Sequence, residues 1–241
     1  MTIGLLVERG AGWQAPLVAT GLAALPVAVL FAVVPMPTGR RPRPEAGESP
    51  GARSRPAMPR VAAPLLLMAA AIACYVASEV GVSNWLVRFL EPAPLSTATL
   101  ALSLYWAGIA VGRMVSSQIA DRFDHRRFTV TCAAALAVTL VGAIVVPSLP
   151  LSVGLFALAG VASGPIFPMI IAIGGERYPD RSAAVSGLLG GTAVTGSIVY
   201  PPIMGLLSVT VGLTVAMLGN AVLAVACATA LVLAGRSAQW D

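Results

Sequence analysis

Long apolar stretches alternate with short polar ones along the chain, and this pattern predicts membrane-spanning helices. A helix needs about 20 consecutive, mainly apolar residues to cross a bilayer. Seven stretches have this length, and we expect one helix in each of residues 14–36, 62–87, 95–120, 128–147, 151–174, 183–207 and 210–234. The sequence therefore predicts an all-α integral membrane protein with about seven transmembrane helices.

The first apolar stretch is open to a second interpretation, as a secretory signal peptide. A signal peptide has an apolar core of about 7–15 residues followed by a small-residue cleavage site. This stretch is longer and has no clear site of that kind, so we expect a spanning helix within residues 1–37. Residues 38–60 are rich in Pro, Gly, Ser and Arg and predict a flexible linker. Residues 61–241 then form a six-helix bundle.

The composition supports a lipid environment. Of the 241 residues, 57% are hydrophobic and only 10% are charged, whereas a soluble domain carries about 25% charged residues. The net charge of +5 does not indicate nucleic acid, because the basic residues form short clusters between apolar stretches. We therefore expect the lipid bilayer, and no nucleic acid, as a partner.

The arginines alternate between loops, and this alternation predicts the topology. They concentrate in the linker, in the loops at 121–127 and 175–182, and at the C-terminus. Because Arg-rich loops stay on the cytoplasmic side, we expect these segments inside the cell and a multi-pass protein of the cell membrane. The N-terminus is then outside, which is the arrangement expected if earlier helices are missing.

The segment GRMVSSQIADRFDHRR, residues 112–127, combines a small-residue stripe with a charged loop. Asp121 follows the C-terminal end of its own helix, where the helix dipole is unfavourable for an anion. The start of the next cytoplasmic helix, near Ser182, would favour it, and together with Arg113 or Arg122 it would form a releasable latch. The alternative is a solvated loop that only fixes topology. The stripe lets another helix approach closely and consists of Gly108, Gly112, Ser116 and Ala120.

Residues 75–90, YVASEVGVSNWLVRFL, place polar side chains inside a spanning helix. Glu79 lies near mid-bilayer, where a carboxylate is costly and therefore indicates function: binding substrate hydroxyls or carrying a proton. The alternative is a hydrogen bond between helices. Trp85 is either a stacking surface for a sugar ring or an interfacial anchor. The substrate-binding residues that we predict are Tyr75, Glu79, Asn84 and Trp85, with Thr195 of the sixth stretch.

Residues 160–180, GVASGPIFPMIIAIGGERYPD, carry two helix breakers within a membrane span. Pro165 and Pro168 interrupt the backbone hydrogen bonds, which is tolerated where a helix lines a cavity or is buried in protein. The alternative is a packing kink without function. Gly160 and Gly164 form a GxxxG pair for close helix packing. In the last stretch, Asn220 is expected to hold helices together.

These three segments resemble the major facilitator superfamily. Residues 112–127 are similar to the loop between helices eight and nine of this family. The pattern Y-x-x-x-E-x(5)-W is similar to helix seven of its fucose permease-like branch, and the segment closing in G-E-R-Y-P is similar to helix ten of that branch. Two residues depart from the loop pattern: Asp124 replaces a usual Gly of a tight turn, and Ser117 a small Gly. The resemblance implies helices 6–12, hence the C-terminal half of a carrier, and a cytoplasmic gate formed by Gly112, Arg113, Asp121, Arg122, Arg126 and Arg127.

The resemblance implies secondary active or facilitative transport of a small polar solute by alternating access. A sugar is one candidate and a proton one coupling ion. The partner would be a missing N-terminal half or a second copy; the alternative is a non-transporting membrane scaffold or fragment. No enzyme motif such as HExxH occurs, so no catalytic residue or cofactor is expected. His125 has no neighbouring imidazole or thiol, and no metal site is expected.

Overall fold

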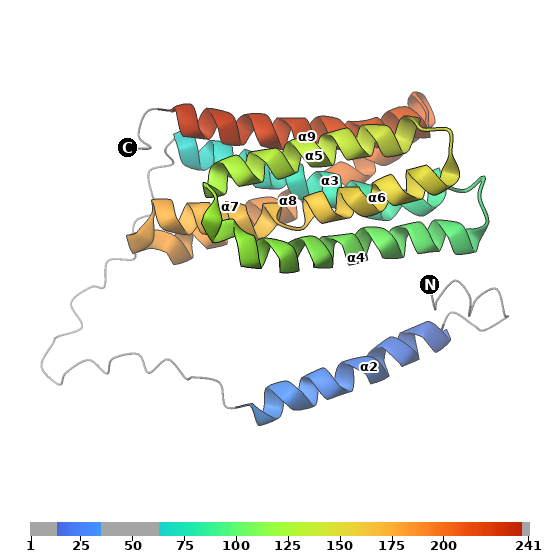
Figure 1. Cartoon of the computed structure of the whole chain (residues 1–241), viewed down its shortest axis with the longest axis horizontal. Coiled ribbons are helices and arrows are strands. Elements are labelled where there is room, and N and C mark those ends of the chain that lie inside the picture. Colours follow the sequence, from blue (N-terminus) through green and yellow to red (C-terminus); the bar gives the residue numbers. More distant parts are fainter. Residues whose placement is uncertain (1–13, 35–62, 238–241) are drawn as a thin grey trace, which may run out of the picture. The chain divides into compact units, whose positions relative to one another are not determined.

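The computed structural model describes residues 14–34 and 63–237. The chain divides into two units, Met1–Ala57 and Met58–Asp241 (Figure 1). The first contains helix α2, Gln14–Val33, which is the helix expected over 14–36 and includes Pro26. The linker expected over 38–60 lies outside the described residues.

The second unit is a bundle of long apolar helices. Six of its helical stretches are long and apolar enough to cross a membrane, and with α2 they confirm the predicted all-α fold of about seven helices. Short 3-10 turns at Ala120–Arg122 and Pro179–Arg181 precede α5 and α8. The helices are α3 (Ala63–Phe89), α4 (Leu95–Ile119), α5 (His125–Val145), α6 (Leu149–Ser163), α7 (Ile166–Arg177), α8 (Ser182–Thr210) and α9 (Leu213–Arg236).

Helix α3 packs against α8 and α9, α4 packs against α6, and α5 packs against both α6 and α9 (Figure 1). The largest side chains of the core include Tyr75, Tyr105 and Phe156, none of which is exposed. Large apolar side chains also cover the outside of the bundle; Val138 is 72% exposed and Val222 67%. Lipid tails are as apolar as these side chains, so the bundle suits a bilayer on its outer surface.

Helices α4 and α6 cross so closely that their backbones touch. Each of four glycines faces a backbone carbonyl oxygen of the other helix that a Cβ atom would overlap: Gly108 faces Ala157, Gly112 faces Val161, Gly160 faces Tyr105 and Gly164 faces Ile109. The stripe predicted on α4 thus has a partner stripe on α6. Glycine is needed on both helices because any side chain would force them apart.

A single span is interrupted between α6 and α7. Helix α6 ends at Ser163 and α7 begins at Ile166, so the gap lies at Gly164 and Pro165. Pro165 has no N–H to donate to the preceding turn. Pro168, which we also expected to break the helix, lies in the first turn of α7, where N–H groups need no partner within the helix. The interruption is thus confined to two residues.

Candidate functional site

A polar cluster lies inside the bundle where α3 meets α6. The Tyr75 hydroxyl of α3 donates a hydrogen bond to Glu79 Oε2, one helical turn further on. The same hydroxyl lies 3.1 Å from Ser163 Oγ, at the last residue of α6. Tyr75 and Ser163 are fully buried and Glu79 is partly buried. The predicted pair Tyr75–Glu79 therefore extends to a third residue on another helix.

Glu79 lies well inside its helix. Sixteen residues of α3 precede it and ten follow, counted from Ala63–Phe89, which puts it about 15 Å from the nearer end. Among the described residues it has no ion-pair partner. Hydrogen bonding from Tyr75, and not charge pairing, therefore supports this carboxyl group. An ionisable residue at such a depth is costly and marks a candidate functional site.

Tyr105 of α4 adds an incomplete member to the cluster. Its side chain is fully buried, and its hydroxyl has no hydrogen-bond partner in the described part of the chain. The hydroxyl has Ser163 and Glu79 as its polar neighbours. Leaving a buried hydroxyl unpaired costs about 1–3 kcal/mol, and Ser163 is the nearby hydroxyl that can pair with it.

The other predicted substrate-binding residues do not join this cluster. Asn84 is exposed on α3, and Trp85 lies beside it with the Arg88 guanidinium 5.9 Å from the ring centroid. Thr195 is exposed on α8, and its hydroxyl donates to the Gly191 carbonyl oxygen at 3.2 Å. None of the three forms a hydrogen bond to Tyr75 or Glu79 in the described structure. Their binding role stays a prediction.

A second buried polar group joins α3, α8 and α9. Ser78 Oγ donates to the backbone oxygen of Asn220 at 2.9 Å, which ties α3 to α9. The Asn220 Oδ1 and the Tyr200 hydroxyl are buried without a partner among the described residues. A Cβ on Gly81 would overlap Asn220 Oδ1, so the glycine lets α9 approach. Asn220 thus lies at a helix contact, as expected.

At one end of the bundle, His125 links two helices. Its Nδ1 lies 2.8 Å from Glu176 Oε1 near the end of α7, and its Nε2 lies 3.9 Å from Asp121 Oδ1. These residues line a cavity of about 350 Å³ with Asp124 and Arg126. His125 and Glu176 are far apart in sequence, and we had not predicted their contact.

The predicted gating residues surround the same end. Arg113, Arg122 and Arg127 are exposed, and Asp121 is 97% exposed. Among the described residues, Asp121 forms no ion pair with Arg113 or Arg122. The others lie close to neighbouring helices: Gly112 contacts Val161 of α6, and Arg126 packs against Gly235 of α9. The gating role itself stays a prediction.

The turn before α5 does not need the glycine that Asp124 replaces. Asp124 has φ −60° and ψ 118°, which any residue adopts. Its Oδ1 accepts a hydrogen bond from the Arg127 amide at 2.7 Å, so it caps the N-terminus of α5. The departure from the family pattern therefore has a local structural reason.

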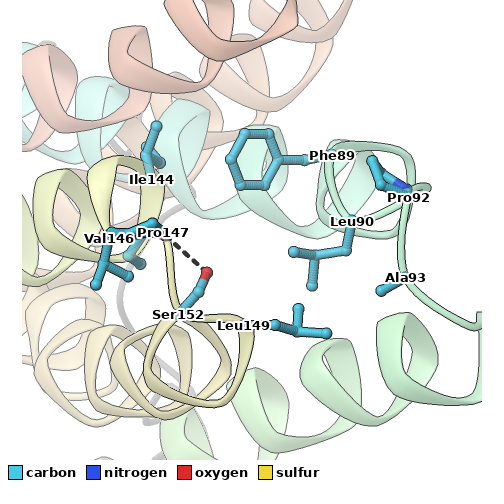
Figure 2. Close-up of a pocket in the computed structure, with 10 residues that line it drawn as sticks. Phe89, Leu90, Pro92, Ala93, Ile144, Val146, Pro147, Leu149 and Ser152 are labelled. Atoms are coloured by element: carbon cyan, nitrogen blue, oxygen red, sulfur yellow. Dashed lines mark hydrogen bonds between the residues drawn. The ribbon is translucent and has the colours of Figure 1, made fainter.

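The opposite end of the bundle holds an apolar pocket, shown in Figure 2. It has a volume of about 260 Å³ and lies between the loop after α3 and the loop before α6. Phe89, Leu90 and Leu149 line it, and Ser152 donates to the Ala143 carbonyl oxygen at 2.7 Å. No ionisable side chain lines this pocket, so it differs from the polar cluster. The described residues contain no group of His, Cys, Asp or Glu side chains suited to a metal ion.

The apolar helices, the break in the α6–α7 span and the carboxyl group inside α3 describe a multi-pass membrane protein with a polar site in its interior. The model of the Major Facilitator Superfamily matches residues 66–239, and the chain belongs to this family. Its members are transporters, which confirms that the chain is not an enzyme. A comparison with curated proteins gave no match.

Solved structures show the same fold. The chain is similar to the E. coli fucose:proton symporter FucP, with 17% identity and a TM-score of 0.69 over 92% of this chain and 55% of that one. A second FucP structure, in the outward conformation, gives 16% identity and a TM-score of 0.67 over 92% of this chain and 54% of that one. The chain is also similar to the POT family transporter PepTSo, with 22% identity and a TM-score of 0.64 over 72% of this chain and 37% of that one. The chain thus spans about half the length of FucP.

Proposed function

We propose that this chain takes part in secondary active or facilitative transport of a small polar solute by alternating access. The observation that carries the proposal is the cluster of Tyr75, Glu79 and Ser163, a carboxyl group with two hydroxyls inside a transporter fold. Polar groups inside a membrane span mark substrate and ion pathways in transporters. The break at Pro165 beside the cluster fits this role, since a proline within a span is tolerated where the helix lines a cavity or is buried in protein.

The chemistry of the cluster favours a solute rich in hydroxyl groups, such as a sugar. A carboxylate accepts two or more hydrogen bonds from hydroxyls, and a tyrosine hydroxyl both donates and accepts. The carboxyl group of Glu79 is also the proton-carrying group that we propose for this cluster. FucP, a fucose:proton symporter, is a precedent for both ligands. Asn84, Trp85 and Thr195 are proposed as further lining residues.

A transport cavity in this family lies between two six-helix units. Residues 63–237 supply one such unit. We therefore propose that transport requires a second unit, either a complementary N-terminal half or a second copy of this chain. The loop with Asp121 and its arginines would close the cavity on the cytoplasmic side of the cell membrane, where the C-terminus also lies.

Reconstitution at two protein loadings tests the proposal. The chain is placed in liposomes at an average well below one copy per vesicle, and at several copies per vesicle. Uptake of labelled monosaccharides is then measured under an inward proton gradient. We expect no uptake by single copies and uptake only when vesicles hold a second copy or a complementary half.

Two results would contradict parts of this account. Uptake that stays constant per copy down to the lowest loading would refute the requirement for a second unit. The absence of uptake at every loading, with a complementary half also present, would instead favour the non-transporting scaffold.

A further inference from the structure

The hydrogen bonds in the polar cluster have a direction that depends on the proton of Glu79. A hydroxyl donates one hydrogen, and an ionised carboxylate only accepts. With Glu79 ionised, Tyr75 donates to it, and Ser163 must then donate to Tyr75 across the 3.1 Å contact. With a proton on Oε2, Glu79 can donate to Tyr75, and Tyr75 can then donate to Ser163. One proton on Oε2 can therefore reverse both bonds.

The far end of this chain of hydroxyls is the interruption between two half-helices. Ser163 is the last residue of α6, and Pro165 leaves the Val161 carbonyl oxygen without its usual helical donor. When the reversal releases the Ser163 hydrogen from Tyr75, the hydroxyl can donate to the carbonyl oxygen of Ala159 or Gly160 in its own helix, directly before the Val161 carbonyl that Pro165 leaves without a donor. Such backbone bonds from serine bend helices. The bend would act where the helix is already interrupted.

Tyr105 offers another partner in the same place. Its buried hydroxyl makes no hydrogen bond of good geometry among the described residues, and Ser163 is its neighbouring hydroxyl. It can donate to Ser163 in one state and accept from it in the other. Ser163 therefore has two hydroxyl groups beside it, those of Tyr75 and Tyr105, with which it can exchange hydrogen bonds.

We propose that protonation of Glu79 is relayed through the hydroxyls of Tyr75 and Ser163 to the interruption between α6 and α7, and that it changes how firmly α7 is held. The inference rests on the proposed function, because it uses the same Glu79 as the proton-binding group.

The relay is isolated from other ionisable groups in the described structure. Tyr75 on its own helix and Tyr105 on α4 are the titratable groups facing Glu79, and α6 faces the cluster with Ser163. Helices α8 and α9 approach α3 with the uncharged Tyr200 and Asn220. The ionisable groups of α7, Glu176 and Arg177, lie at its far end, where Glu176 contacts His125.

Hydrogen exchange in lipid nanodiscs tests the relay. Protection factors of the amides of residues 164–172, which exclude the end of α7 that contacts His125, are corrected for the intrinsic rate and compared between about pH 5 and pH 8. We expect a change of about fivefold, the factor that corresponds to one net hydrogen bond. Tyr75→Phe, Ser163→Ala and Glu79→Gln should each abolish the change. Tyr200→Phe, which removes another buried hydroxyl, should retain it.

Two outcomes would overturn the relay: protection independent of pH in the unmodified chain, or a pH dependence that persists in both Tyr75→Phe and Ser163→Ala. The readout does not depend on solute. If the pH dependence is present and lost in these variants while the chain neither binds nor transports any solute, the relay stands and the proposed function fails. If uptake occurs with pH-independent protection, the transport function stands and the relay fails.

Discussion

Replacing Gly160 by alanine tests the close crossing of α4 and α6. A Cβ at this position would overlap the Tyr105 carbonyl oxygen, and it would lie 3.0 Å from the carbonyl carbon of Tyr105 and 3.2 Å from the Ile109 amide nitrogen. All three are backbone atoms of α4, which cannot swing aside as the end of a side chain can. The two helices would have to separate, and the neighbouring glycine contacts would loosen with them.

The expected loss of stability follows from these contacts. Overpacking a tight interior costs about 1–3 kcal/mol, and rigid backbone neighbours favour the upper part of that range. Alanine regains roughly 0.5–1 kcal/mol over glycine through helix propensity. We therefore expect Gly160→Ala to lower the free energy of unfolding by about 2 kcal/mol.

Gly154→Ala is the matched control, because it makes the same substitution in the same helix. No atom lies within 4 Å of a Cβ built there, so the variant should be neutral or slightly more stable. Both variants are unfolded with SDS in mixed micelles and followed by circular dichroism. Equal unfolding free energies for the two variants would refute the argument that the α4–α6 crossing requires glycine.

Two further predictions concern the charged end of the bundle. Asp124→Ala removes the cap of α5 and should cost about 1 kcal/mol in the same assay, whereas an unchanged unfolding free energy would show that the cap is dispensable. Glu176→Ala breaks the contact with His125; because the two side chains are 59% and 25% exposed, the cost should stay below about 1 kcal/mol. Faster amide exchange at the end of α7 is the expected sign, and unchanged exchange there would contradict the link.

The helices could be predicted from the sequence because each span must fill the membrane with apolar residues. The interruption at Pro165 could also be predicted, since proline lacks the amide hydrogen in any context. The effect of Pro168 could not, because it depends on where α7 begins. A proline in the first turn loses no helical hydrogen bond, and that position becomes visible only in the folded chain.

Only the contact between residues that are close in the sequence could be predicted in the candidate site. Tyr75 and Glu79 are one turn apart on one helix, so their contact follows from helical geometry. Ser163 is 88 residues from Tyr75, and it joins the cluster because the folded bundle places the end of α6 against α3. Tyr105 lies in an apolar stretch, where a tyrosine looks like an ordinary core residue. Only the tertiary packing gives these two residues their position.

The charged loop shows the same limit. The sequence placed Asp121 at an unfavourable helix end and suggested an arginine or the helix near Ser182 as its partner. In the structure, the side chain nearest to Asp121 in an ion-pair geometry is the imidazole of His125, four residues further along the chain. The two meet because the chain turns through the 3-10 segment Ala120–Arg122 before Asp124 caps α5. Such a turn depends on capping contacts that a pattern of charges does not encode.

Solute binding by Glu79 variants tests the central claim most directly. A panel of monosaccharides is screened for binding to the purified chain, and affinities are compared with Glu79→Gln and with Glu91→Gln, which makes the same change in the exposed loop after α3. Losing a hydrogen bond to a charged group costs about 1.5–3 kcal/mol, so Glu79→Gln should weaken binding about 10- to 100-fold. Glu91→Gln should bind like the unmodified chain. Equal affinities for Glu79→Gln and the unmodified chain, or no binding of any solute by the chain assembled with a second copy or a complementary half, would contradict the claim that this cluster is a transport site.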